Sequence, residues 1–224
     1  MNISLNYISC GAGETLILLH GNGEDMGYFS NQVDFFAKNY TVYAVDTRGH
    51  GNSPRGSAEF TLSQFADDLL CFMDEHSIKK AHLLGFSDGG NIALIFALRY
   101  PERVDRLILN GANLFPEGLE ESVLSEIVTE YEKLLNQDDE ESVRNRELFA
   151  LMVNEPQIKP QELASLSCKV LVIAGTKDMI SESHTRLIAD SIPNSKLVFI
   201  EGGHFIAVSQ YKRFNQAVYD FLTE

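Results

Sequence analysis

Three side chains, far apart in the sequence, have the types and surroundings needed for nucleophilic catalysis. Ser87 lies in the motif Gly85-Phe-Ser-Asp-Gly89, between an apolar run and a stretch with helical spacing. A G-x-S-x-G motif in that context predicts a tight strand-to-helix turn, whose flanking positions must lack side chains and whose serine oxygen is exposed. Free N–H groups and the dipole at the start of the helix would favour a developing negative charge there. We therefore predict that Ser87 is a nucleophile.

A serine hydroxyl is a poor nucleophile until a base accepts its proton. Among the six histidines, His204 lies in Glu201-Gly-Gly-His-Phe205, just after the last predicted strand, and would reach the same sheet edge as Ser87. Asp178 follows the preceding strand and would orient the imidazole and stabilise its charged form. The strand that ends at Asn110 offers only amides as an alternative. The chain order Ser, Asp, His is the one expected for a nucleophile in such a turn.

The sequence His20-Gly-Asn-Gly23 directly follows the apolar run 15–19. A glycine-containing loop at the end of a strand can present backbone N–H groups to an oxyanion. We predict that the N–H groups of Asn22 and Asp88 form this oxyanion hole, with the N–H of Gly21 as an alternative to that of Asn22. We interpret His20 as a side chain that organises the loop.

Short β-rich runs alternate with amphipathic stretches along the chain, which predicts a mostly parallel sheet flanked by helices. The carboxyl ends of such strands meet at one edge of the sheet, where ligands bind. Strands are predicted at 3–8, 15–19, 41–45, 80–85, 104–110, 171–174 and 196–200, with a turn at 11–13. Helices are predicted at 31–38, 62–76, from Ser87 to the residues before Pro101, at 182–191 and at 210–222.

The alternation is interrupted between Gly111 and about Pro160. Apolar residues recur at helical spacing between 119 and 135, and a second helix is expected over 141–153. We predict a single domain spanning 1–224, in which the insertion of about 111–160 forms a small helical cap over the carboxyl ends of the strands.

The composition excludes several classes of partner. The chain has 224 residues, 44% of them hydrophobic, with 18 basic and 32 acidic side chains and a formal charge of −14. Such a surface repels phosphate backbones and anionic lipid, so neither nucleic acid nor a membrane is an expected partner. Three widely spaced cysteines indicate neither a disulfide framework nor a zinc site. The N-terminus lacks the features of a signal peptide, and we expect a cytoplasmic protein.

Taken together, the motifs resemble those of the α/β-hydrolase superfamily, in order and in approximate spacing. The resemblance covers nearly the whole chain and is strongest to esterases and carbon–carbon hydrolases with short caps. The motifs that carry it are HGNG at 20–23, DTRGHGNSP at 46–54, GFSDGG at 85–90, GTKDMI at 175–180 and GGHF at 202–205. The resemblance implies an eight-stranded type of sheet, no metal or organic cofactor, and a triad of Ser87, Asp178 and His204. It also implies structural roles for Asp46, Arg48 and His50.

Two departures from the family pattern bear on the expected structure and substrate. One strand, rather than an antiparallel pair, is expected before the run 15–19, and the cap has only about fifty residues. In addition, Asp88 places a carboxylate beside the nucleophile, which suits the helix dipole and predicts discrimination against anionic substrates.

We expect the protein to hydrolyse a small carboxylic ester or related acyl bond through an acyl-enzyme. Carbon–carbon bond hydrolysis, thioester hydrolysis, acyl transfer and cofactor-free perhydrolysis use the same triad and stay open. A serine at the elbow, where an aspartate would be needed, disfavours haloalkane dehalogenation and epoxide hydrolysis. The rival from another class is a ligand-binding receptor of the same fold that does not turn over.

Overall fold

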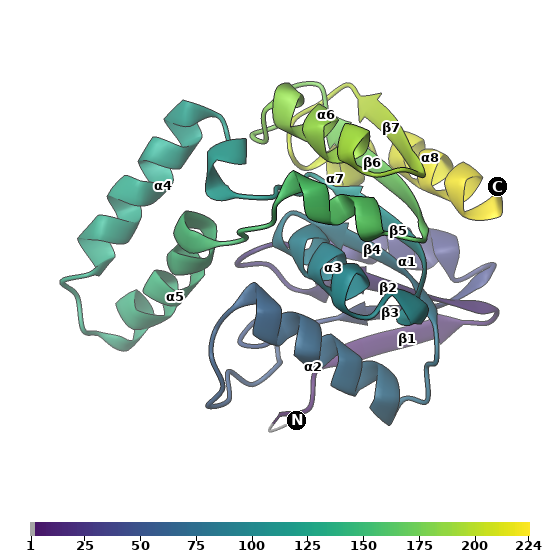
Figure 1. Cartoon of the computed structure of the whole chain (residues 1–224). Helices are drawn as coiled ribbons and strands as arrows, with labels where there is room; N and C mark the ends of the chain where they lie inside the picture. The colour runs from purple at the N-terminus through teal and green to yellow at the C-terminus, as the bar shows by residue number, and fades with distance from the viewer. Residues whose placement is uncertain (1–2) are drawn as a thin grey trace.

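The computed structural model describes residues 3–224 as a seven-stranded sheet with helices on both faces (Figure 1). The strands lie in the order β1-β3-β2-β4-β5-β6-β7, and every neighbouring pair is parallel except β1 and β3. Their bounds are β1 Tyr7–Gly11, β2 Glu14–Leu19, β3 Tyr40–Val45, β4 Ala81–Phe86, β5 Val104–Asn110, β6 Lys169–Gly175 and β7 Ser195–Ile200. The predicted fold class, a mostly parallel sheet flanked by helices, is confirmed.

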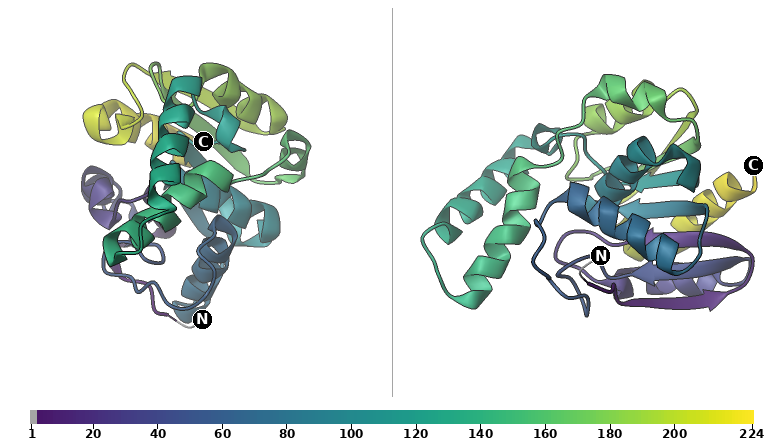
Figure 2. Two further views of the ribbon diagram at one scale, coloured as in Figure 1. Left: turned by 90° about the vertical axis from the view of Figure 1, so that its left-hand side faces the viewer. Right: turned by 60° about the horizontal axis from the view of Figure 1, so that its bottom comes forward.

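Helices cover both faces of the sheet, with α2, α3 and α6 on one and α1, α7 and α8 on the other (Figures 1 and 2). The α-helices are α1 Ser30–Phe36, α2 Leu62–Glu75, α3 Asp88–Arg99, α4 Glu121–Leu134, α5 Glu140–Asn154, α6 Glu182–Ser191, α7 Ile206–Ser209 and α8 Tyr211–Thr223. Short 3-10 helices occur at η1 Met26–Phe29, η2 Pro101–Arg103, η3 Pro116–Gly118 and η4 Pro160–Ser165.

Strand β2 shows why its sequence is apolar on both sides. Leu16 and Leu18 pack in the core under α1 and α8, whereas Ile17 and Leu19 pack in the core under α2 and α3. Each of these four side chains is at most 2% exposed. A central strand covered by helices on both faces has no solvent side and reads as a continuous apolar run.

The first strand differs from the prediction. Residues 3–8 were expected as a strand and 11–13 as a turn, but β1 runs from Tyr7 to Gly11 and pairs with residues 41–45 of β3. The residues before Tyr7 extend past Val45, where β3 ends, and have no strand to pair with. Instead Asn6 bonds to the loop after β3, through its N–H to Ser53 and its carbonyl to the N–H of Asp46. Met1 and Asn2, which the prediction of a missing signal peptide also covered, lie outside the described residues.

Helices α4 and α5 form an antiparallel hairpin, Glu121–Asn154, that projects from the body beyond the carboxyl ends of the strands (Figures 1 and 2). Helix α4 contains no buried residue, and its apolar side chains are half-buried beside α5. Asp139 caps α5, because its carboxylate accepts the N–H of Ser142 at 3.0 Å. The acidic run before α5 therefore begins a helix. We refer to Glu121–Asn154 as the hairpin.

A buried histidine fixes the segment that leads into the hairpin. The His184 side chain accepts the backbone N–H of Leu114 at 2.9 Å through Nε2, and its ring fills the space where a Cβ on Gly118 would lie, 2.6 Å from the ring atoms. The residue is 5% exposed. Burial lowers the pKa of His184 from 6.5 to about 4, because the neutral ring avoids the cost of charge in an apolar setting.

We expect His184 to make the stability of the protein depend on pH. Its folded-state pKa lies below the unfolded value, so the unfolded chain binds more protons between the two. The contribution is therefore complete above pH 6.5 and is lost as the pH falls toward 4, by about 3 kcal/mol at most. Urea unfolding at pH 7 and pH 4.5 should show a smaller pH-dependent loss for His184→Gln than for the wild type. Equal losses in the two proteins would contradict this role.

Candidate active site

The turn between β4 and α3 holds Ser87 in a backbone conformation that few side chains adopt. Its φ is 53° and its ψ is −121°, and its N–H donates to the carbonyl of Asn110 at the end of β5 at 2.8 Å. Within residues 81–94, Ser87 is the one residue that is not buried. A strained, partly exposed residue in an otherwise buried segment is typical of a functional site.

Gly85 and Gly89 of the motif lie too close to neighbouring backbone atoms to carry a side chain. A Cβ on Gly85 would lie 2.2 Å from the carbonyl oxygen of Gly89, and a Cβ on Gly89 would lie 2.0 Å from that of Leu19 in β2. Both distances are far shorter than a van der Waals contact, so any side chain here would force the strand and the helix apart. The structure therefore has the tight strand-to-helix turn that the motif predicts.

His204 and Asp178, which the sequence analysis paired, are hydrogen-bonded. The Nδ1 atom of His204 lies 2.6 Å from Oδ1 of Asp178, and the two side chains are 6% and 2% exposed. The carboxylate also accepts the backbone N–H of Ile180 at 3.0 Å and that of Gly175 at 3.3 Å. These donors hold the carboxylate, which in turn directs Nε2 of the imidazole away from Asp178.

The imidazole lies beside the serine turn. Its ring centroid is 4.6 Å from that of Phe86, the residue before Ser87. A Cβ on Gly111, which follows Asn110, would lie 2.7 Å from Cε1 of His204. Within residues 3–224 the Ser87 hydroxyl makes no hydrogen bond to the imidazole, and such bonds are often long before substrate binds. Gly111, with a φ of 61°, was not recognised as a site residue from the sequence, because its role depends on a distant loop.

The loop after β2 adopts a turn that distinguishes the two candidate oxyanion donors. The N–H of Gly21 is bonded to Oε2 of Glu24 at 3.2 Å, and the N–H of Glu24 donates to the carbonyl of Gly21. Among the hydrogen bonds of residues 3–224, none uses the N–H of Asn22 or of Asp88. The geometry therefore favours Asn22 over Gly21 as the first donor.

Glu24 and Tyr28 also lie beside the site, although neither was predicted from the sequence as a site residue. Burial raises the pKa of Glu24 to about 7, against the opposing effects of the Gly21 N–H and of His204. The ring of Tyr28 stacks on Phe86 with centroids 4.3 Å apart, and burial raises the pKa of its hydroxyl. Their position a few residues after the HGNG motif was the only available signal.

His20, Arg48 and Asp46, for which structural roles were predicted, make buried hydrogen bonds in and around the loops after β2 and β3. Nε2 of His20 accepts the backbone N–H of Thr47 at 3.0 Å, which ties the loop after β2 to the loop after β3. Burial lowers the pKa of His20, which favours the neutral ring. Arg48 makes a bidentate pair with the carboxylate of Asp68, at 2.6 and 2.7 Å, and both side chains are at most 3% exposed. Asp46 accepts hydrogen bonds from Met26 and Asn52 in these two loops and from Asn6, the residue before β1.

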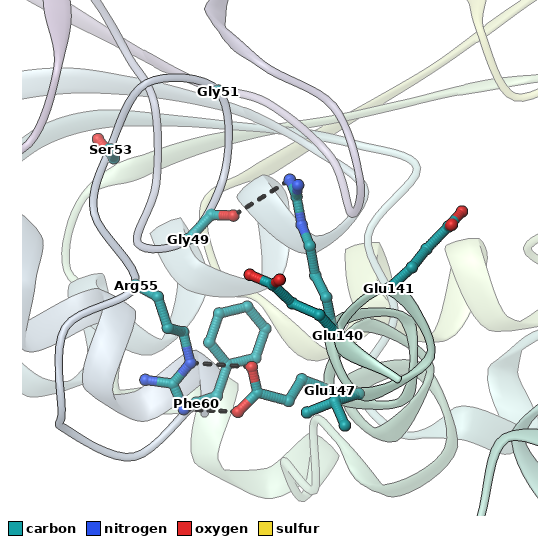
Figure 3. A pocket seen from close by; sticks show the side chains of 10 residues that line it. Gly49, Gly51, Ser53, Arg55, Phe60, Glu140, Glu141 and Glu147 are labelled. Carbon is teal, nitrogen blue, oxygen red and sulfur yellow. Dashed lines mark hydrogen bonds and ion pairs between the residues drawn. The ribbon is translucent and has the colours of Figure 1, made fainter. Parts of the chain in front are cut away.

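A cavity of about 670 Å³ lies between the loop after β3 and helix α5 (Figure 3). The guanidinium of Arg55 bonds in a bidentate manner to Glu147, at 2.6 and 2.9 Å, and lies over the ring of Phe60. None of Ser87, Asp178 and His204 lines this cavity. The residues that line it come from the loop after β3 in the body of the protein and from α5 of the hairpin.

The part of the chain that the structure describes shows neither a membrane-spanning helix nor a cluster of metal ligands. No helix of residues 3–224 is long and apolar enough to cross a bilayer. In the same residues, no group of three or more histidine, cysteine, aspartate or glutamate side chains is arranged to hold a metal ion. The three cysteines are free thiols, of which Cys168 is buried.

Comparison with known proteins identifies the family of the chain. The profile of the α/β-hydrolase fold family matches residues 14–128. The chain is 33% identical to a 2-hydroxymuconate semialdehyde hydrolase of Pseudomonas sp. strain CF600, over 99% of this chain and 91% of that protein. It is 26% identical to 3-oxoadipate enol-lactonase 2 of Acinetobacter baylyi, over 97% and 92%. A crystal structure of a meta-cleavage product hydrolase from Pseudomonas fluorescens superposes with a TM-score of 0.81 at 26% identity, covering 99% of this chain and 94% of that one.

The chain belongs to the α/β-hydrolase fold family. The relatives just named are hydrolases that differ in substrate, and this supports a hydrolase in the general sense.

Proposed function

We propose that this protein is a serine hydrolase that cleaves a small carboxylic ester or related acyl bond, with Ser87, His204 and Asp178 as its triad. The observation that carries the proposal is the 2.6 Å bond between His204 and Asp178 beside the strained turn that holds the partly exposed Ser87. A base oriented by a buried carboxylate next to an accessible serine is the arrangement needed for acyl transfer.

The reaction follows from the positions of these groups. Ser87 Oγ attacks the substrate carbonyl while Nε2 of His204 accepts the serine proton, and Asp178 stabilises the resulting imidazolium. The N–H groups of Asn22 and Asp88 bind the oxyanion. The tetrahedral intermediate collapses, the leaving group takes the proton from His204, and an acyl-enzyme remains. Water, deprotonated by His204, then attacks the acyl group, and the acid leaves as His204 returns the proton to Oγ of Ser87.

The hairpin serves this reaction as a cap in our proposal. It projects beyond the strand ends that carry the triad, and α5 contacts the loop that supplies Asn22, through a 2.9 Å bond to Leu148. We propose that residues of about 111–160 form this cap within one domain spanning the chain. We further propose that the enzyme acts in the cytoplasm on a small molecule, without a metal or organic cofactor.

Carbon–carbon bond hydrolysis is the second candidate. It is favoured by the 33% identity to a 2-hydroxymuconate semialdehyde hydrolase, whose name indicates a semialdehyde substrate. A panel of nitrophenyl esters with short, medium and aromatic acyl groups, a simple lactone and an unsaturated 1,5-diketone separates the two. We expect multiple turnovers of short esters. Turnover of the diketone alone would favour carbon–carbon cleavage. If no substrate of the panel is turned over, a binding protein is favoured.

Asp88 is expected to influence which substrates are accepted. The carboxylate is 8% exposed and directly follows Ser87, and burial raises its pKa against the smaller opposing effects of the amide N–H groups of Asn22 and Asn91. Negative charge on this carboxylate would repel an anionic substrate, so Asp88→Asn should raise kcat/KM for an acidic ester relative to a neutral one by about fivefold, or ~1 kcal/mol. The surface variant Asp67→Asn provides the control. An unchanged ratio for Asp88→Asn would remove this role.

A further inference from the structure

The side chain of Asn22 joins the serine turn to the hairpin. Its amide nitrogen donates to Oδ2 of Asp88 and to the backbone carbonyl of Leu148 in α5, both at 2.9 Å. The two acceptors settle the orientation of the amide, because the reverse orientation would set its oxygen against a carboxylate and a carbonyl. The backbone N–H of the same residue is the proposed oxyanion donor. One residue therefore touches the hairpin, the serine turn and the oxyanion hole.

On the side of the serine turn, the acceptor is fixed. The buried carboxylate of Asp88 also accepts the amide of Asn91 at 3.2 Å. The amide nitrogen of Asn91 donates to Oδ1 of Asn113, and the backbone N–H of Asn113 donates to Oδ1 of Asn91, both at 2.9 Å. Buried networks in which each member is satisfied hold their side chains in one arrangement. Asp88 is therefore a rigid anchor for the amide of Asn22.

On the side of the hairpin, α5 is fastened at two consecutive residues. Glu147 bonds to Arg55 in the loop after β3, and Leu148 bonds to Asn22 in the loop after β2. Figure 3 shows the first of these contacts at the wall of the cavity. The second contact joins α5 directly to the loop that contains the proposed oxyanion donor.

We propose that Asn22 is a positioning residue through which seating of the hairpin sets the oxyanion hole. The inference rests on the proposed function, since it concerns the same oxyanion. A donor nitrogen stabilises the oxyanion at a distance of about 2.7–3.1 Å. A small displacement of the loop therefore reduces the stabilisation of the transition state. An interaction made mainly in the transition state affects kcat more than ground-state binding. Loss of the amide contacts should therefore lower kcat and leave KM nearly unchanged.

The full chain with Asn22→Ala tests the proposal, because this variant keeps the backbone N–H and removes both amide contacts. On a short-chain nitrophenyl ester, kcat should fall by about 10- to 100-fold and KM should change by less than about threefold. Asn22→Ser can satisfy at most one of the two acceptors, so its kcat should lie between those of the wild type and of Asn22→Ala. This variant replaces Asn22→Ala in the test if Asn22→Ala does not fold. Glu130→Gln, which removes an exposed ion pair with Lys133 inside α4, is the matched control and should keep kcat within about twofold.

A double-mutant cycle tests the coupling itself. Glu147→Gln weakens the contact with Arg55 and should lower kcat several-fold in the wild type, but not in the Asn22→Ala background, because coupled residues are not additive. Independent, multiplicative effects overturn the proposal, as does an Asn22→Ala enzyme whose kcat is within about twofold of wild type. A wild-type protein that neither turns over esters nor is labelled at Ser87 by a fluorophosphonate overturns the proposed function first, and this inference with it.

Discussion

Replacing Ser87, the proposed nucleophile, by alanine is expected to lower kcat on a short-chain ester by on the order of a million-fold, the loss seen for the nucleophile of a serine protease. The variant removes the nucleophile and leaves water as the only attacking group. A steady-state assay with a limit of detection near the uncatalysed rate measures the loss. Thermal unfolding should be almost unchanged, because alanine keeps the Cβ and the backbone conformation of Ser87 and loses only the hydroxyl.

Ser209→Ala provides the matched control for this loss. Ser209 is an exposed serine at the end of α7, close in sequence to His204, and its hydroxyl bonds only to the carbonyl of Phe205. The variant should keep kcat within about twofold of wild type, since surface changes rarely exceed ±0.5 kcal/mol. Ester turnover by Ser87→Ala at the wild-type rate would assign the chemistry to another residue.

Replacing Asp178 by asparagine should lower kcat by about ten-thousand-fold and leave substrate binding nearly intact. The amide has the same shape, but it cannot accept hydrogen bonds on both sides from His204, Gly175 and Ile180 as the carboxylate does. It would favour the wrong tautomer of the imidazole and would not stabilise the imidazolium. The pH–rate profile and kcat, measured beside the exposed variant Asp190→Asn, test this role. A loss of less than about tenfold would show that the carboxylate does not act on the base.

The fold was predictable where local pattern and tertiary structure coincide. The bounds of β5 and α6 match the predicted 104–110 and 182–191, because an apolar run or an amphipathic helix ends there at a change of residue type. Strand β1 was misplaced, since its length is set by the end of β3 at Val45 and not by its own sequence. The single strand before β2 agrees with the predicted departure from the usual antiparallel pair, and it gives seven strands instead of eight.

The site was predictable only as far as its residues carry a signal of their own. His204 and Asp178 each follow a strand, and parallel strands bring such residues to one edge, so their contact could be anticipated. The role of Gly111 depends on the approach of the His204 ring, which no local pattern encodes. The same holds for the bond from Asn22 to Leu148, between residues 126 positions apart.

Reaction with a fluorophosphonate, followed by mass mapping of the labelled peptide, tests the central claim most directly. A serine whose proton is taken by the His204–Asp178 pair should react once per chain, at residue 87, and ester turnover should disappear in proportion to the label. Folded protein that still hydrolyses esters after complete reaction, or that carries the label on another serine, would contradict the account.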